Sequence, residues 1–287
     1  MSPLFTLKQL PLTRHLTSID GLRTAHWEGG TVGAPPIILL HGLNGSHHGL
    51  WPLATRLSDY HLFLPDMPGH GSSALPKKAR VAGVVQWFDA YMTRIAALTG
   101  QPPVVIAHSF GAQIAFMACQ QKPEAYRDCI LLTPVPRVSI LPYLFGKSLA
   151  LLPSRLALEV VGRNESLRFW RGSFLLHRHT PETRALVRWI GDQGANSPDK
   201  FAFYVSISQE LMGTPSYSRA GVTKGRFYCV AGDNDRMLTP ASLAELRTMF
   251  GKKHFAICKN TGHLMPIEAP DETAALLRTM LPPTSTD

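Results

Sequence analysis

The sequence predicts an α/β fold, in which a mostly parallel sheet carries helices on both faces and a helical insertion interrupts the alternation. Short segments that are apolar at every position alternate with segments of helical periodicity. A strand that is apolar throughout is buried on both faces, which is typical of parallel sheets covered by helices. Residues 134–213 then show helix-start signals and no clear strand.

The strands are expected in a fixed order along the chain. Residues 4–28 hold two extended stretches around a turn at Ser18–Gly21, which predicts an N-terminal hairpin. Continuous apolar strands are then expected at residues 36–40, 61–65, 104–107, 129–132, 227–230 and 254–257.

Three core helices follow from periodicity and capping. One apolar face is formed by Val84, Phe88, Tyr91, Met92 and Ile95, in a helix that Gly100 ends. A second helix has its apolar face between residues 112 and 119. Residues 239–240, Thr-Pro, supply the N-cap and first turn of a third.

The insertion at 134–213 is predicted to be all-helical. Helix starts are expected at Ser154, at Asn164, at Thr180 and at Ser197. Insertions at the carboxyl ends of parallel strands lie above the ligand crevice. We therefore expect residues 1–133 and 214–287 to form the core domain and residues 134–213 to form a cap, although the insertion could also serve packing alone.

Composition and charge exclude several classes of protein. The chain has 287 residues, 45% of them hydrophobic and 17% charged, so it is not a disordered chain. The net charge is +9, with a basic run at Arg163, Arg168, Arg171, Arg178, Arg184 and Arg188. No nucleic-acid motif accompanies it. We expect no nucleic-acid partner, and a solvated basic face or a site for an anionic group. Oligomeric state is left open.

Cysteine usage and hydropathy also set expectations. The four cysteines form no C-x-x-C pair, which argues against a cysteine-ligated zinc site and favours buried, reduced thiols. The first residues lack the apolar core of a signal peptide, and no run of 18 apolar residues occurs. A cytoplasmic protein without stable membrane insertion is expected.

The strongest chemical signal is the pentapeptide at 107–111, Ala-His-Ser-Phe-Gly, which lies between a buried strand and a helix. It matches the nucleophile elbow G-x-S-x-G with alanine in place of the first glycine. A sharp turn there would expose the hydroxyl of Ser109, while the small neighbours allow close backbone packing.

A serine nucleophile needs a base, and the base needs an orienting acid. His263 follows the last expected strand and precedes the C-terminal helix. Asp235 lies three residues after Gly232, at the end of the preceding strand, and is the expected acid. Asp233 is its competitor and could instead bind loop amides.

The chain resembles the α/β-hydrolase superfamily over nearly its whole length. The motifs that carry the resemblance are His41-Gly42, residues 66–72 (Asp-Met-Pro-Gly-His-Gly-Ser), the Ser109 elbow, Gly232 to Asp235, and Gly262-His263 with Glu268-Ala269-Pro270. The order Ser109, Asp235, His263 is that of the superfamily. The resemblance implies an eight-stranded type of sheet and an oxyanion hole from the backbone N–H groups of Leu43 and Phe110. It also implies structural roles for Asp66, His70 and His108.

The expected activity is that of a serine hydrolase on a carboxylic ester, thioester or lactone, through a covalent acyl-enzyme. A serine at the elbow argues against haloalkane dehalogenases and epoxide hydrolases, which use aspartate there. The expected substrate is a small molecule with an apolar part, with room for an anion. The candidate substrate-binding residues are Trp170, Phe174, Tyr204 and Arg168. The chemistry requires no metal and no organic cofactor.

Two alternatives stay open. Similar proteins use the same triad to hydrolyse carbon–carbon bonds, as meta-cleavage product hydrolases do, or to eliminate a carboxylate, as the menaquinone-pathway synthase does. The arginines Arg168 and Arg171 near Trp170 suit such anionic substrates. The third possibility is a non-catalytic ligand sensor, as plant hormone receptors are.

Overall fold

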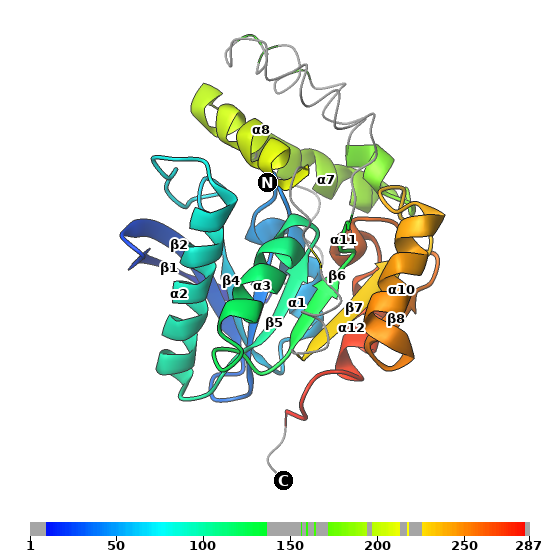
Figure 1. Ribbon diagram of the computed structural model, residues 1–287, viewed down its shortest axis with the longest axis horizontal. Coiled ribbons are helices and arrows are strands. Elements are labelled where there is room, and N and C mark those ends of the chain that lie inside the picture. The colour runs from blue at the N-terminus through cyan, green and yellow to red at the C-terminus, as the bar shows by residue number, and fades with distance from the viewer. Residues whose placement is uncertain are drawn as a thin grey trace.

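The computed structural model describes residues 10–136, 156, 159, 164, 172–193, 197–212, 217 and 226–284. They form an eight-stranded sheet in the order β1-β2-β4-β3-β5-β6-β7-β8 (Figure 1). The strands are β1 (Leu12–Ile19), β2 (Leu22–Gly30), β3 (Pro36–Leu40), β4 (His61–Pro65), β5 (Val104–His108), β6 (Cys129–Leu132), β7 (Phe227–Gly232) and β8 (Phe255–Cys258). Strand β2 runs antiparallel to both of its neighbours, and every other pair is parallel.

The central strands form because their side chains are apolar on both faces. All residues of β3, β4, β5 and β6 are buried, as the sequence predicts for a parallel sheet covered on both sides. The N-terminal hairpin is confirmed as β1 and β2. Its turn places Asp20 at φ 49° and Gly21 at φ 73°.

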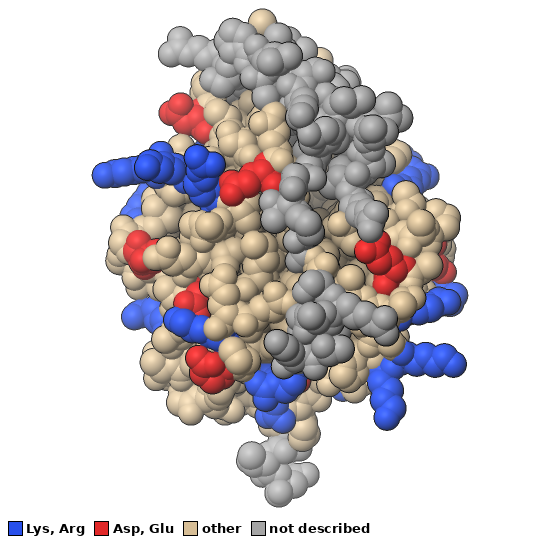
Figure 2. All heavy atoms as spheres, in the orientation of Figure 1, with Lys and Arg blue, Asp and Glu red and all other residues tan. Residues whose placement is uncertain are grey.

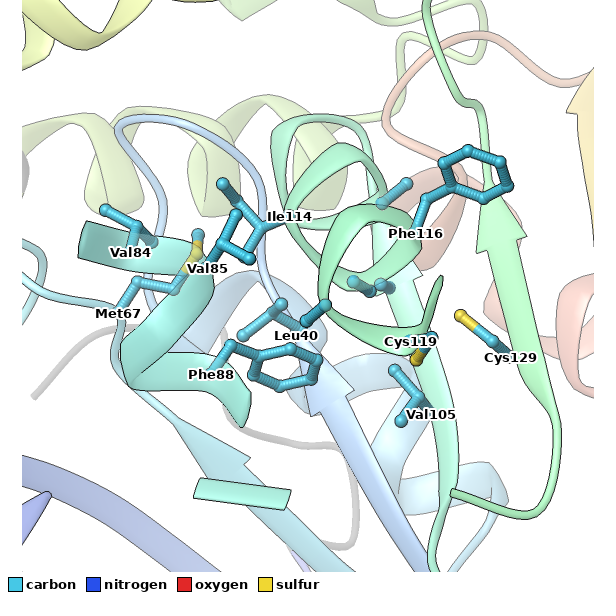
Figure 3. Close-up of a cluster of buried hydrophobic side chains, with 14 of the residues drawn as sticks. Leu40, Met67, Val84, Val85, Phe88, Val105, Ile114, Phe116, Cys119 and Cys129 are labelled. Carbon is cyan, nitrogen blue, oxygen red and sulfur yellow. The ribbon is translucent and has the colours of Figure 1, made fainter. Parts of the chain in front are cut away.

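The helices divide between the two faces of the sheet. One core packs α2 (Val81–Thr99), α3 (Phe110–Gln121) and α10 (Pro240–His254) against it, and Figure 3 shows Phe88, Ile114 and Phe116 between these elements. The other core packs α1 (Trp51–Arg56), α11 (Met265–Glu268) and α12 (Pro270–Arg278). The predicted helix end at Gly100 is confirmed, with φ 73°.

Two of the expected helices of the insertion are present as α7 (Pro181–Gln193) and α8 (Pro198–Met212). Both lie across one end of the sheet in Figure 1. Helix α8 reaches the loop that follows β4, because the hydroxyl of Tyr204 donates to the carbonyl of Gly69 over 3.1 Å. The helices expected after Ser154 and Asn164 fall mainly outside the described residues.

The charged side chains on the surface are dispersed, as the sequence predicts. On the face drawn in Figure 2, Lys and Arg are scattered and Asp and Glu lie among them. All four cysteines are buried, as the sequence predicts, and each is free in the structure. No helix in the described part of the chain combines the length and hydrophobicity that a membrane span needs.

Candidate active site

Ser109 occupies a strained turn between β5 and α3. Its φ of 53° and ψ of −115° are unusual for a residue with a side chain. The turn is held tightly, since a Cβ at Gly111 would lie only 2.4 Å from the carbonyl oxygen of His41. The N–H of Ser109 donates to the carbonyl of Leu132 over 3.0 Å, which ties the turn to β6.

His263 links the hydroxyl of Ser109 to a buried carboxylate. Its Nε2 lies 2.9 Å from Oγ of Ser109, and its Nδ1 lies 2.8 Å from Oδ2 of Asp235. The side chain of Asp235 is 0% exposed, and its other oxygen accepts the N–H of Met237. An ionised carboxylate only accepts hydrogen bonds. Nδ1 of His263 therefore carries the proton, which leaves Nε2 free to accept the hydroxyl of Ser109.

The competing acid, Asp233, lies elsewhere on the same loop. Its Oδ1 accepts the N–H of Thr261 over 3.2 Å, and its Oδ2 lies 3.8 Å from the ammonium of Lys259. The loop turns between the two acids because Gly232 packs against the chain opposite, where a Cβ would lie 2.4 Å from the carbonyl of Thr261. The structure thus brings Asp235, and not Asp233, to the imidazole of His263.

The loop after β3 passes directly beside the serine. A Cβ at Gly42 would lie 3.3 Å from Cβ of Ser109. Nε2 of His41 accepts the N–H of Met67 over 3.0 Å, so its Nδ1 is the donor in the 2.8 Å contact with the carbonyl of Gly42. The N–H of Gly45 donates to the same carbonyl.

These two hydrogen bonds fix the orientation of one peptide unit. The carbonyl of Gly42 and the N–H of Leu43 belong to the same planar trans peptide and point in opposite directions. Holding the carbonyl of Gly42 therefore aims the N–H of Leu43 away from His41. On the other side of the serine, Phe110 begins α3, and the N–H of a first helical residue has no acceptor within its own helix.

Burial keeps the surrounding histidines neutral. Burial lowers the pKa of His108 to about 3, and repulsion from His263 adds to this shift. Nε2 of His108 lies 2.8 Å from the carbonyl of His263, which supports the loop. The pKa of His70 is also lowered to about 3, chiefly by burial.

Asp66 is the buried anion of this region. Burial disfavours its charge, but the hydrogen bond and charge of His47, together with His41 and the N–H of Ser72, outweigh burial and lower its pKa. The carboxylate accepts hydrogen bonds from the backbone and Nδ1 of His47 and from the N–H of Ser72. The bond from Ser72 closes the turn at residues 66–72, and the bonds from His47 tie that turn to the segment after β3.

A cavity of about 300 Å³ lies on the far side of the Gly42 loop; His108 and Leu264, the chain neighbours of Ser109 and His263, line it, but Ser109 and His263 do not. Its walls come from the loop after β3, from the 3-10 helix η1 (His47–Leu50), from residues 172–175, from α7 and from the segment after His263. The lining residues are His41, Gly42, Leu43, Asn44, Gly45, Ser46, Gly49, Leu50, His108, Gly172, Leu175, Val187, Ile190, Gly191, Leu264, Pro266 and Ile267. Among these described wall residues none is Lys, Arg, Asp or Glu.

The expected substrate-binding residues lie away from these walls or outside the described chain. Tyr204 packs on His70, with ring centroids 4.6 Å apart, and belongs to the core beneath α8. Phe174 is 39% exposed and lies beneath the guanidinium of Arg236. Trp170 and Arg168 fall outside the described residues.

Sequence reasoning missed the wall that α7 supplies. Val187, Ile190 and Gly191 line the cavity and follow one another at the spacing of one helical face. That periodicity was the available signal.

Glu268 fastens the insertion to the loop that carries His263. Its Oε2 accepts the backbone N–H groups of His177 and Arg178 over 2.7 and 2.9 Å. The N–H of His263 donates to the carbonyl of Leu175 over 3.0 Å. Arg178, part of the basic run, forms an ion pair with Glu272. The charge of Arg178 is therefore paired where the insertion meets the core.

Acidification is expected to destabilise the protein through its buried histidines. An unfolded histidine titrates near pH 6.5, whereas His108 in the folded chain has its pKa at about 3. Between these values the unfolded chain binds a proton that the folded chain excludes, so stability falls as pH falls. Between pH 7 and pH 5, His108→Gln should lose about 2 kcal/mol less unfolding free energy than the wild type loses.

Denaturant unfolding at both pH values measures this difference. His179→Gln, which replaces an exposed histidine, is the matched control and should keep the wild-type loss. An unchanged loss in His108→Gln would contradict the assignment.

The comparisons with known proteins agree with this architecture. A model described as the alpha/beta hydrolase family matches residues 37–276. The chain is 22% identical to Lipase 1 of Psychrobacter immobilis over 271 residues, which cover 91% of this chain and 81% of the lipase.

Two solved structures share the fold. The 2-hydroxy-6-oxo-6-phenylhexa-2,4-dienoate hydrolase of Rhodococcus sp. strain RHA1 aligns with a TM-score of 0.77 at 16% identity, over 94% of this chain and 98% of that one. A thermophilic esterase from Thermogutta terrifontis aligns with a TM-score of 0.73 at 18% identity, over 93% and 97%. Since the family model spans most of the sequence and the sheet has the expected topology, the chain belongs to the α/β hydrolase family.

Proposed function

We propose that this protein hydrolyses carboxylic esters, thioesters or lactones of apolar acids through an acyl-enzyme on Ser109. The observation that carries the proposal is the continuous hydrogen-bonded path from Ser109 through His263 to Asp235, near an apolar cavity. The similarity to a lipase over 91% of the chain supports the same chemistry.

The reaction follows from the positions of these groups. Oγ of Ser109 attacks the carbonyl carbon while Nε2 of His263 takes the hydroxyl proton. Asp235 holds the imidazole and stabilises its positive charge. The tetrahedral intermediate collapses when His263 protonates the leaving alcohol. Water, deprotonated by His263, then attacks the acyl-enzyme and releases the acid and Ser109.

The oxyanion of the intermediate would be bound by the N–H groups of Leu43 and Phe110. His41 orients the first through the carbonyl of Gly42, and the second lies at the N-terminus of α3. Fixed backbone donors of this kind act without reorganisation, and the loss of one typically costs ~10²–10³ in kcat. His41 is thus a positioning residue for the oxyanion site.

The division of the chain is part of the same proposal. Residues 1–133 and 214–287 form the catalytic core, and residues 134–213 form a cap that supplies substrate contacts. The cavity walls from α7 and residues 172–175 support this division, as does the attachment of His177 to Glu268. An apolar small-molecule substrate fits the cavity, and a cytoplasmic location stays a prediction.

Carbon–carbon bond hydrolysis and carboxylate elimination stay alternatives. Such substrates carry a carboxylate that needs a cation, and the candidate cations Arg168 and Arg171 lie outside the described residues. Arg178 is paired with Glu272. Turnover of p-nitrophenyl esters, compared with turnover of a vinylogous diketone acid, separates these chemistries. Binding without turnover of any ester would indicate a ligand sensor.

A fluorophosphonate probe should label Ser109 covalently, because only a serine activated by a buried base is strongly nucleophilic. Labelling is measured by gel fluorescence and by mass spectrometry of the modified peptide. Ser109→Ala should abolish the label and the steady turnover of p-nitrophenyl esters. Retained labelling in this variant would rule out Ser109 as the nucleophile.

The two candidate acids should differ strongly. Asp235→Asn should lose on the order of 10⁴ in kcat, because the amide can donate to Nδ1 and favour the wrong tautomer, and because it lacks the charge that stabilises the imidazolium. Asp233→Asn, which changes only loop contacts, should stay within about tenfold of the wild type by comparison. Steady-state kinetics on one ester decide the order, and the reverse ranking would assign the acid to Asp233.

Gly191→Leu should shorten the acyl chain that the protein accepts. A Cβ at Gly191 meets no atom within 4 Å, and the residue lines the cavity. A leucine there would occupy space for two or three methylene groups, each worth about 0.8 kcal/mol. The ratio of kcat/KM for octanoyl over butyryl ester should fall more than tenfold.

Arg184→Leu, at an exposed position on the same helix, is the control and should leave that ratio unchanged. If Gly191→Leu also left the ratio unchanged, the acyl chain would not lie in this cavity.

A further inference from the structure

A second cluster of ionisable side chains lies on strands β1 and β2, away from Ser109. Strands β4 and β3 separate β2 from β5. His15 of β1 is the direct cross-strand partner of His26 of β2. Glu28 is two residues beyond His26, so it projects from the same face of the sheet. The backbone register therefore places these three side chains together.

The polar atoms of the cluster converge. One nitrogen each of His15 and His26 and one oxygen of Glu28 lie within 4.8 Å of one another. Oε2 of Glu28 is 3.2 Å from Nε2 of His15. Its other oxygen, Oε1, lies 2.7 Å from Nε2 of His61 at the start of β4. The carboxylate is thus held between imidazoles from two neighbouring strands.

Two buried polar atoms at this cluster lack hydrogen-bond partners among the described residues. His26 is only 5% exposed, and its Nδ1 is buried and unpaired. The hydroxyl of Tyr91, on α2, is also buried and unpaired, and its ring packs edge-on against His26 with centroids 5.7 Å apart. Buried polar groups are nearly always paired, and each exception calls for an explanation such as a bound ion.

We propose that His15, His26 and Glu28 bind a divalent transition-metal ion of the zinc type. Two imidazoles and one carboxylate form a donor set that suits Zn²⁺, Ni²⁺ and Cu²⁺ and leaves a position for water. Mg²⁺ and Ca²⁺ prefer all-oxygen ligands and would bind poorly. His61 does not bind the ion; it holds the carboxylate of Glu28 in orientation, as outer hydrogen bonds do in metal sites.

The ion would stabilise the edge of the sheet by linking neighbouring strands. It would join β1 to β2, while His61 extends the link to β4. The catalytic chemistry proposed above does not involve this site, so the two proposals can fail independently.

The test uses the full-length protein after chelator treatment and dialysis. Isothermal titration with Zn²⁺ measures stoichiometry and affinity, and the visible absorption of bound Co²⁺ reports on the ligands. We expect one strong site and a thermal midpoint that rises with Zn²⁺ and not with Mg²⁺. All of these readouts are independent of ester turnover.

Variants assign the site. His15→Ala removes a half-exposed ligand from an edge strand and should weaken Zn²⁺ binding at least tenfold and abolish the thermal shift. Glu28→Gln retains an acceptor for His61 and should do the same. His179→Ala, at an exposed histidine elsewhere, should bind Zn²⁺ as the wild type does.

Equal Zn²⁺ affinity in the wild type and His15→Ala would overturn the proposal, as would the absence of any strong site in the wild type. If Glu28→Gln fails to fold, His15→Ala still decides the outcome. Equal Zn²⁺ binding by the wild type and by His15→Ala would assign the ion to other histidines of the chain.

Discussion

The close approach of α3 to the end of β3 is the constraint on which the catalytic arrangement depends. Gly111 touches the carbonyl of His41 so closely that no side chain fits between them. This contact forces the chain to turn sharply at Ser109, whose positive φ would otherwise be unfavourable. The same turn places the first amide of α3 beside the hydroxyl and brings the loop of Gly42 against Cβ of Ser109. One packing contact therefore positions the proposed nucleophile and the proposed anion donors.

Two buried networks hold the groups around that turn. On one side, His41 and Gly45 orient the carbonyl of Gly42. The carboxylate of Asp66 accepts a hydrogen bond from Nδ1 of His47 nearby. On the other side, His108 supports the carbonyl of His263. Each member has a hydrogen-bond partner suited to a neutral histidine or an ionised carboxylate. Because these groups are buried, their geometry costs no reorganisation when charge develops at the site.

The insertion joins the core at the catalytic loop itself. Glu268 accepts two backbone amides from residues 177 and 178, and Leu175 accepts the amide of His263. A shift of that segment would consequently move both the wall of the cavity and the loop of the base. The ion pair between Arg178 and Glu272 adds to this attachment. One segment therefore forms part of the cavity wall and holds the position of His263.

Local patterns in the sequence determined the fold class and most strands, and they predicted the order of the proposed triad. Fully apolar runs report burial on both faces, and the elbow at Ser109 carries its signature within five residues. The choice between Asp233 and Asp235 needed the tertiary structure, since the direction of each carboxylate depends on how Gly232 packs against the next loop.

The cavity walls and the histidine cluster on the sheet also needed the tertiary structure. Val187 and Ile267 are 80 residues apart in sequence and meet only after the insertion folds back. His15 and His26 meet because of the register of the β1–β2 hairpin, whereas His61 joins them from β4, 33 residues beyond Glu28. Aromatic side chains such as Tyr204 look alike in sequence whether they pack in a core or line a pocket. Their surroundings alone distinguish the two roles, because contacts between distant segments leave no local pattern.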